Sequence, residues 1–330
     1  MFKYIVKRLL LALLILFGVS LIIYTLVRVM PTDFVDNQFA SQLTQGTINE
    51  EDLRRMKALY GLSDNSFWGI IKGYFQWLSN LLRGNLGNSF KYQAPVKDVI
   101  SQYMWVSFFV AFVAMFFQFL IAIPLGVTAA THQYSARDYA VTIFTMIGIS
   151  LPSFFFAAIL IKVFAVDLGW FPIQGELDAS VTNSNGFTDF FDNIHHMILP
   201  IVTLIVINIG SLMRYTRTNT LEVLNADYIR TARAKGLRES KVIYKHAFRN
   251  TMIPLVTLLA GTLPTLFSGA MITEQVFKIT GIGNLAYQAQ VAGDIPFIMG
   301  YNMFLAILSV LGTLLADLMY VVVDPRVKLK

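Results

Sequence analysis

Two long stretches without charged side chains constrain the fold more than any other feature of the sequence. No Asp, Glu, Lys or Arg occurs from Val99 to Ala136, or from Leu9 to Val27. A helix needs about 20 consecutive apolar residues to cross a bilayer. Only 14% of all residues are charged, whereas soluble domains carry about 25%. The chain is therefore predicted to be an all-α membrane protein.

Six segments are predicted to cross the membrane. The predicted organisation is an N-terminal segment with the first span at 1–30, an external region at 31–98, a five-span core at 99–323 and a tail at 324–330. The core spans are expected at 103–130, 139–165, 197–213, 251–273 and 297–323, with a cytoplasmic loop at 214–250 between the fourth and fifth.

The distribution of Lys and Arg predicts the orientation. Loop 166–196 has no basic residue and loop 276–296 has only Lys278, whereas loop 214–250 is rich in Arg and Lys. Short cytoplasmic loops carry the excess of basic residues, so both termini are predicted to be cytoplasmic. The basic residues gather in loops rather than in one stripe, so no nucleic-acid partner is predicted.

The external region is predicted to contain two helices. The segment 49–62 resembles a short capped helix closed by Gly61. In segment 67–84, apolar residues recur from Trp68 through Phe75 to Leu82. Such a face fits a helix lying in the outer interface of the membrane, and equally a helix packed on the body of the protein.

The sequence offers little for catalysis. It has no cysteine and four histidines, and it contains neither a G-x-x-x-x-G-K-[ST] phosphate loop nor an H-E-x-x-H metal motif. No catalytic residue, metal site or cofactor is predicted, and a membrane-embedded enzyme is disfavoured. Asp317 is the one clear charge inside a predicted span, and it either lines a conduit or pairs near the cytoplasmic interface with a basic residue such as Arg326. A self-sufficient channel or ion-coupled carrier typically has more buried acids.

The basic loop predicts two helices joined at a glycine. Leu221, Leu224, Tyr228 and Ala232 form one apolar stripe, and Gly236 is placed to end the helix in a left-handed conformation. Ser240 is expected to cap a second helix. Such a short amphipathic helix suits docking into a partner's groove. The alternative is a positive loop that binds anionic lipid.

Several ordered motifs resemble one family. They include "LLRGNLGNSFKYQAPVKDVI", "LGWFPIQG", "ADYIRTARAKGL" and "LADLMYVVVDPRVK". The chain resembles the inner-membrane permease subunits of ABC importers, in the branch that imports dipeptides, oligopeptides and nickel chelates. The resemblance implies a type I importer permease fold with six transmembrane helices, in a bacterial plasma membrane.

In that family, the basic loop corresponds to the E-A-A-x-x-x-G motif, whose helix docks on the ATPase subunit. Ala232 and Gly236 match the second Ala and the Gly, whereas Arg230 and Thr231 replace the Glu and the first Ala. The replacement puts an ion pair of the motif's Glu in doubt, and Asp227 or Glu222 is expected to contact the ATPase instead. The resemblance implies a coupling helix with these residues: Glu222, Asp227, Tyr228, Arg230, Thr231, Ala232, Arg233, Ala234, Gly236 and Leu237.

A second family motif, E-x-x-F-x-x-P-G-L-G, follows the fifth span. This chain matches it at Glu274, Phe277, Gly281 and Gly283, but Thr280 stands where Pro is expected, so a looser turn is predicted. Together with Trp170, Phe171 and Pro172, these residues are expected to form external loops where a binding protein docks.

The resemblance also implies the partners and the mechanism. They are a second homologous permease, two cytosolic ATPases that hydrolyse ATP, an external solute-binding protein and the lipid bilayer. The cargo is expected to be oligopeptides or dipeptides, with a nickel chelate as the alternative. Spans two, three and five are expected to line the path.

Overall fold

A computed structural model of the chain describes residues 2–28, 34–44, 51, 55, 67–174 and 186–323. The described residues are helical, apart from loops and one isolated bridge between Asn88 and Pro95. The helix predicted at 49–62, apart from positions 51 and 55, and the tail at 324–330 lie outside these ranges.

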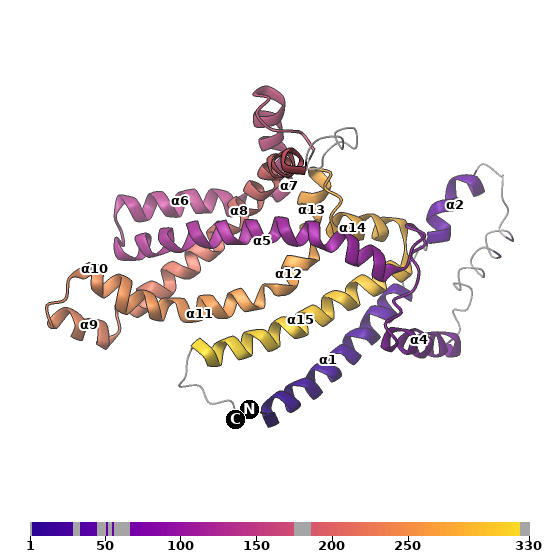
Figure 1. Cartoon of the computed structure of the whole chain (residues 1–330), viewed down its shortest axis with the longest axis horizontal. Helices are drawn as coiled ribbons and strands as arrows, with labels where there is room; N and C mark the ends of the chain where they lie inside the picture. Colours follow the sequence, from indigo (N-terminus) through magenta and orange to yellow (C-terminus); the bar gives the residue numbers. More distant parts are fainter. Residues whose placement is uncertain are drawn as a thin grey trace.

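Six helices form the body of a bundle (Figure 1). They are α1 (Phe2–Arg28), α5 (Val96–Thr131), α6 (Ala136–Ser150), α8 (Gly186–Leu224), α11 (Phe248–Gly261) and α15 (Ile295–Val323). The other described helices are α2 (Phe34–Thr44), α4 (Phe67–Leu82), α7 (Ser153–Leu160), α9 (Asp227–Ala234), α10 (Glu239–Lys241), α12 (Leu263–Ser268), α13 (Met271–Val276) and α14 (Ile282–Ala292). Two π-helical turns, η1 (Ile161–Asp167) and η3 (Val242–Ala247), complete the set.

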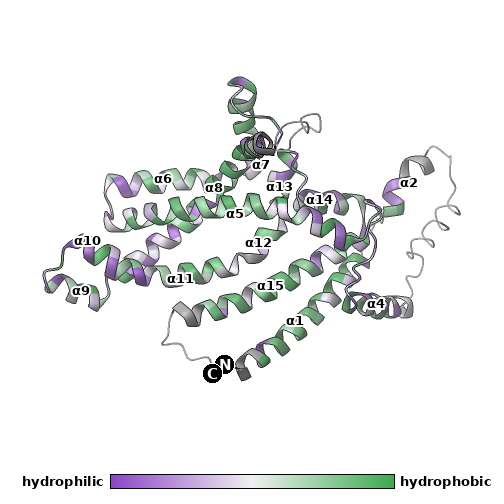
Figure 2. Cartoon of the chain, in the orientation of Figure 1, coloured by the Kyte–Doolittle hydropathy of each residue, from purple (hydrophilic) through white to green (hydrophobic). Residues whose placement is uncertain are grey.

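The bundle has polar ends and a long apolar body (Figure 2). In Figure 1, α9 and α10 lie at one end, whereas α2, α4 and α14 lie at the other. Figure 2 shows hydrophobic colouring along α1, α5 and α15 and hydrophilic colouring around α9 and α10. Apolar bodies with polar ends are what a bilayer requires of a helical bundle.

Four described helices are long and apolar enough to cross a membrane, over Val6–Arg28, Val96–Thr131, Asp192–Leu224 and Ile295–Met319. A fifth is obtained if Ala136–Ser150 and Ser153–Asp167, which meet at a bend of 102°, count as one span. The bend falls at Leu151, whose extended backbone (φ −87°, ψ 129°) is the conformation that a following proline, Pro152, favours.

The segment predicted as the fifth span is interrupted. It consists of α11, α12 and α13, and Gly269 between the last two has a left-handed φ of 73°. Proline and glycine within the segment break the ladder of backbone hydrogen bonds. The count of six spans therefore stays a prediction, as does the orientation of the termini.

Close helix packing at the centre of the bundle depends on glycines that are not conspicuous in the sequence. A Cβ atom at Gly126 of α5 would lie 2.8 Å from the carbonyl oxygen of Met213, and one at Gly148 of α6 would lie 2.4 Å from that of Val206. One at Gly210 of α8 would lie 2.6 Å from the carbonyl oxygen of Thr145. Small residues let helix backbones approach in a membrane, and here they hold α5 and α6 against α8.

Helix α4 shows features of both arrangements predicted for it. Tyr74 is buried against α1, with its hydroxyl 2.8 Å from the Ser20 hydroxyl. Trp68, Phe75 and Leu82 remain exposed, at 76%, 59% and 80%. They recur every seven residues and so share one face. One face of α4 thus packs on the body, and the other is exposed.

Candidate coupling site and transport chamber

The end of the bundle that carries α9 and α10 contains the residues predicted to couple the chain to a partner. α8 ends at Leu224, and α9 begins at Asp227 after an extended Ala226 (φ −70°, ψ 149°). Ile229 and Ala232 of α9 are buried against Val242 and Ala247 of η3. This cluster fixes α9 to the body, because burial of apolar surface is the main stabilising term.

Gly236 ends α9 as predicted. Its φ is 73°, its N–H donates to the Arg233 carbonyl at 2.9 Å, and the Leu237 N–H donates to the Ala232 carbonyl at 3.4 Å. This pair of bonds is the Schellman motif. Leu237 also packs on the buried cluster, so the cap fixes both the length of α9 and the exit of the chain.

Most of the predicted coupling residues are exposed on α9. Asp227 and Arg230 form a loose ion pair at 3.8 Å, with side chains 98% and 72% exposed. Glu222, Tyr228, Thr231, Arg233, Ala234 and Gly236 are exposed as well, Leu237 is half-buried and Ala232 is buried. α9 thus presents a polar face with small side chains, held by a small buried face.

The structure corrects three details of the predicted loop. The predicted stripe ran through Tyr228, but Tyr228 is 46% exposed and Ile229 is buried in its place. The predicted stripe assumed one continuous helix, but the break at Asn225 and Ala226 changes which residues of α9 face the body. Ser240 does not cap the second helix, since α10 begins at Glu239 with Arg238 at the cap position and runs on through η3 into α11.

An ion pair joins α9 to α10. The Arg233 guanidinium donates to the Glu239 carboxylate at 2.6 Å. This hydrogen bond with Arg233 lowers the pKa of Glu239. A carboxyl group with a lowered pKa stabilises the folded protein at pH values above the pKa of the unfolded state, and this stabilisation is lost as the pH falls through the pKa of the folded state. The ion pair is therefore intact at neutral pH.

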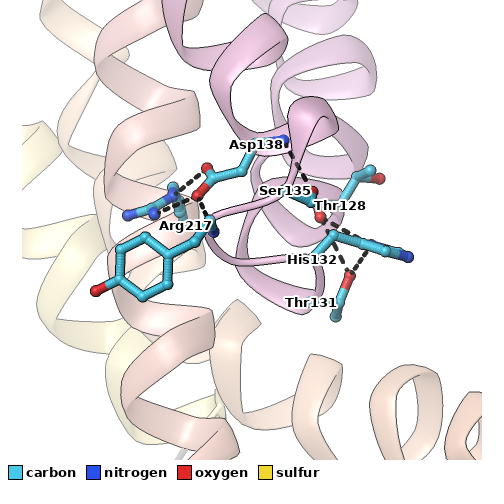
Figure 3. Close-up of polar contacts among 7 residues, drawn as sticks. Thr128, Thr131, His132, Ser135, Asp138 and Arg217 are labelled. Atoms are coloured by element: carbon cyan, nitrogen blue, oxygen red, sulfur yellow. Dashed lines mark hydrogen bonds and ion pairs between the residues drawn. The ribbon is translucent and has the colours of Figure 1, made fainter.

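The turn between α5 and α6 lies beside this loop, since residues of both line one cavity. Arg217 of α8 donates to Asp138 of α6 through two bonds, Nε to Oδ1 at 2.9 Å and Nη2 to Oδ2 at 2.8 Å (Figure 3). The Asp138 side chain is only 5% exposed. Asp138 also accepts the Tyr134 N–H at 3.0 Å, and its own N–H donates to Ser135. A bidentate Arg–carboxylate pair has fixed geometry, so the turn is held to α8.

A chamber of about 600 Å³ lies between α5, α8 and the α11–α12 segment. Its polar lining residues are all uncharged; they are Gln118, Asn208, Ser211, Tyr215, Thr262, Thr265 and Ser268. Met115, Phe119 and Leu204 are among its apolar lining residues. Segments of the predicted spans two, four and five line this chamber, and the prediction that spans two, three and five line the path stays a prediction.

Asp317 does not line this chamber. Its carboxylate lies 2.6 Å from the Arg8 guanidinium of α1. The partner suggested from the sequence, Arg326, lies outside the described residues. The pair joins the beginning of α1 to the end of α15. These two ends are far apart in the sequence, and no sequence pattern predicted that they lie close together.

The residues predicted for an external docking loop are largely buried. Glu274 is 1% exposed and Phe277 0%, and Gly281 and Gly283 are buried too. The Glu274 carboxylate accepts hydrogen bonds from the Ser107 hydroxyl at 2.6 Å, the Ala270 N–H at 3.0 Å and the Asn284 N–H at 2.9 Å. These bonds hold the segment that was predicted to be looser because of Thr280.

The two motifs predicted to be external meet in one cluster. Phe171 packs against a buried cluster that includes Phe277 and Ile279, while Trp170 beside it is 60% exposed and Pro172 is half-buried. The Trp170 carbonyl lies 3.0 Å from Nε2 of His195. Of the predicted external residues, Trp170 is therefore the most accessible to a partner, and the docking role of the group stays a prediction.

Among the described residues, no group of three His, Cys, Asp or Glu side chains is placed to hold a metal ion. The polar clusters at both ends of the bundle contain ion pairs and hydrogen bonds.

Comparison with known proteins identifies the family. Residues 122–329 match the family described as the inner membrane component of binding-protein-dependent transport systems. The chain is 36% identical over 329 residues to the oligopeptide transport system permease protein AppB of Bacillus subtilis, covering 99% of this chain and all of that protein. It is 33% identical over 329 residues to OppB of Haemophilus influenzae, with coverage of 99% and 100%. A putative peptide permease protein of Brucella ovis is 32% identical over 331 residues, 99% of both chains.

The chain belongs to this family of inner-membrane components, the permease subunits of ABC importers. It is a multi-pass protein of the bacterial plasma membrane and a transport subunit rather than an enzyme.

Proposed function

We propose that the chain is the permease subunit of an ATP-driven importer that carries oligopeptides or dipeptides into the cytoplasm. An external solute-binding protein delivers the peptide, two cytosolic ATPases supply the energy, and a second homologous permease completes the path. The chain crosses the membrane six times, with α11 and α12 forming the interrupted fifth span and both termini in the cytoplasm. AppB and OppB are named for oligopeptide transport, which favours peptides over nickel chelates.

The observation that carries this proposal is the connection between α9 and the chamber. α8 contributes Asn208 and Ser211 to the chamber wall and continues to Leu224, and only two residues separate it from α9, which begins at Asp227. On the other side of the loop, η3 runs directly into α11, which contributes Leu258 to the wall. A partner that moves α9 therefore moves two walls of the chamber.

The physical basis of coupling is that α9 is rigidly attached. Its buried face and its Schellman cap leave it few ways to yield, so a displacement passes into α8 and α11 rather than being absorbed locally. ATP-driven closure of the ATPases would rock these helices between inward-facing and outward-facing states. The neutral polar side chains of the chamber offer hydrogen bonds to peptide groups without selecting a charge.

The proposal is tested by peptide uptake into proteoliposomes that contain the assembled complex and the binding protein. Ala234→Trp adds bulk to the exposed face of α9 and is expected to abolish ATP-dependent uptake by blocking docking. Ser101→Trp, at an exposed position near the start of α5 and far along the bundle, is the matched control and is expected to retain uptake. Uptake by the Ala234→Trp complex equal to that of the control would overturn the proposal.

A further inference from the structure

We infer that the turn between α5 and α6 is a second contact point for the cytosolic ATPase, with Tyr134 as the side chain that it presents. The inference rests on the proposed function, because it extends the surface that α9 forms. It begins with an unusual residue: Tyr134 is 74% exposed and has a left-handed φ of 62°.

A tyrosine in this conformation needs support from its surroundings. Left-handed backbone costs free energy for a residue with a Cβ atom, and such residues persist where neighbouring structure fixes them, often at functional sites. The support here is the Tyr134 N–H, which donates to the buried Asp138 carboxylate at 3.0 Å. Arg217 holds that carboxylate from α8 through two further bonds.

The turn is closed on its other side as well. The His132 N–H donates to the Thr128 carbonyl at the end of α5, and the Ser135 N–H donates to the His132 carbonyl. Ser135 then begins α6 as its cap residue. The backbone is therefore fixed at His132 and Ser135, on the two sides of the exposed tyrosine.

The position of the turn identifies the partner. The residues flanking Tyr134, Gln133 and Ser135, line a cavity of about 530 Å³ whose other walls include Arg233 and Glu239. Arg233 belongs to α9 and Glu239 to α10. The turn and α9 are therefore walls of the same cavity, and a protein seated on α9 lies next to the turn. Exposed tyrosines are strong anchors in protein interfaces.

A bilayer surface is the competing partner, since tyrosines are enriched where lipid headgroups begin. A headgroup contact gains its energy from depth alone and needs no fixed backbone. A rigid display instead lowers the cost of ordering a side chain on binding a protein. The clamp of Asp138 and Arg217 thus favours the ATPase.

The chain contains no cysteine, so a single introduced thiol is unique in it. Tyr134→Cys, labelled with a benzophenone maleimide in the assembled complex, is expected to cross-link to an ATPase subunit on illumination. Arg230→Cys on α9 reports on the proposed function. Tyr139 of α6 is 57% exposed, so Tyr139→Cys is the control matched for exposure. It is expected not to cross-link to the ATPase.

The outcomes separate the two hypotheses. Cross-linking from both positions 134 and 230 supports the inference. Cross-linking from position 230 with none from position 134, or equal labelling of lipid at 134 and 139, overturns it and leaves the proposed function standing. Absence of ATPase from both positions overturns both.

A second measurement tests the clamp. Arg217→Gln is expected to lower the yield from position 134 by on the order of tenfold, the effect of losing one well-placed contact, while the yield from position 230 is unchanged. A yield at position 134 that is unaffected by Arg217→Gln would contradict the role given to the clamp.

Discussion

The buried carboxylate of Glu274 leaves no room for a side chain at Gly281. Gly281 has an ordinary backbone (φ −90°, ψ 167°), so nothing in its conformation requires glycine. A Cβ atom there would instead lie 2.5 Å from both Glu274 Oε2 and the Ser107 hydroxyl. Gly281→Ala is therefore expected to destabilise the protein for steric reasons alone.

The magnitude follows from what must move. The carboxylate cannot swing away without lengthening its bonds to the N–H groups of Ala270 and Asn284. Overpacking of a filled site costs about 1–3 kcal/mol, and a buried N–H that loses its acceptor costs a further ~1–3 kcal/mol. Gly281→Ala is thus predicted to cost at least about 1 kcal/mol in the free energy of unfolding.

The assay is thermal unfolding of the purified complex, followed by the intrinsic fluorescence of the chain's four tryptophans. Gly281→Ala is expected to lower the midpoint by several degrees. Gly261→Ala is the matched control, because a Cβ atom at Gly261 of α11 meets nothing within 4 Å. It is expected to leave the midpoint unchanged or raise it, since alanine favours helix by about 0.5–1 kcal/mol.

A double-mutant cycle tests the cause. In a Glu274→Ala background, the carboxylate is gone and the Ser107 hydroxyl is free to rotate, so adding Gly281→Ala is expected to cost much less than it does alone. A coupling free energy of about 0.5–3 kcal/mol is typical of residues in contact. Equal costs in the two backgrounds would refute the reasoning, because the glycine would then serve something other than the carboxylate.

Three further predictions concern the end of the bundle that carries α9 and α10. Gly236→Trp is expected to abolish peptide uptake by obstructing α9. Gly236→Asn is expected to retain uptake, because Asn adopts the left-handed backbone at a cost below the ~1–2 kcal/mol of other residues. Equal uptake by the two variants would exclude the docking role. Arg233→Glu is expected to abolish uptake while the protein remains inserted, and adding Glu239→Arg is expected to restore it by re-forming the ion pair; failure of this rescue would mean that Arg233 contacts the ATPase itself. Arg217→Gln is expected to destabilise the chain by about 3–5 kcal/mol, because it leaves a buried carboxylate unpaired, and adding Asp138→Asn is expected to recover part of that loss in the same unfolding assay.

Local signals in the sequence were sufficient for much of this structure. Uncharged apolar runs located the long helices, because a bilayer accepts few other segments. Gly236 was predicted to end α9, since few other residues adopt its conformation without cost. The buried face of α9 was predicted correctly at Ala232 but not at Ile229, because the break at Asn225 and Ala226 changes which residues face the body.

Contacts between distant residues were beyond the reach of local patterns. Asp138 and Arg217 are 79 residues apart, and neither belongs to a motif that pairs them. Glu274 was expected at a docking surface because its motif was predicted to lie in an external loop, but the structure buries it and pairs it with Ser107 and Asn284. The left-handed Tyr134 carried no signal at all, because tyrosine is common at the ends of membrane helices.

The most direct test of the central claim is affinity purification of this chain from native membranes in mild detergent, with its partners identified by mass spectrometry. The account predicts recovery of a second permease of the same family together with one or two ATPases that contain phosphate-binding loops, and loss of the ATPases when Ala234→Trp is introduced. Recovery of the chain alone, or of a homo-oligomer without any ATPase, would contradict it.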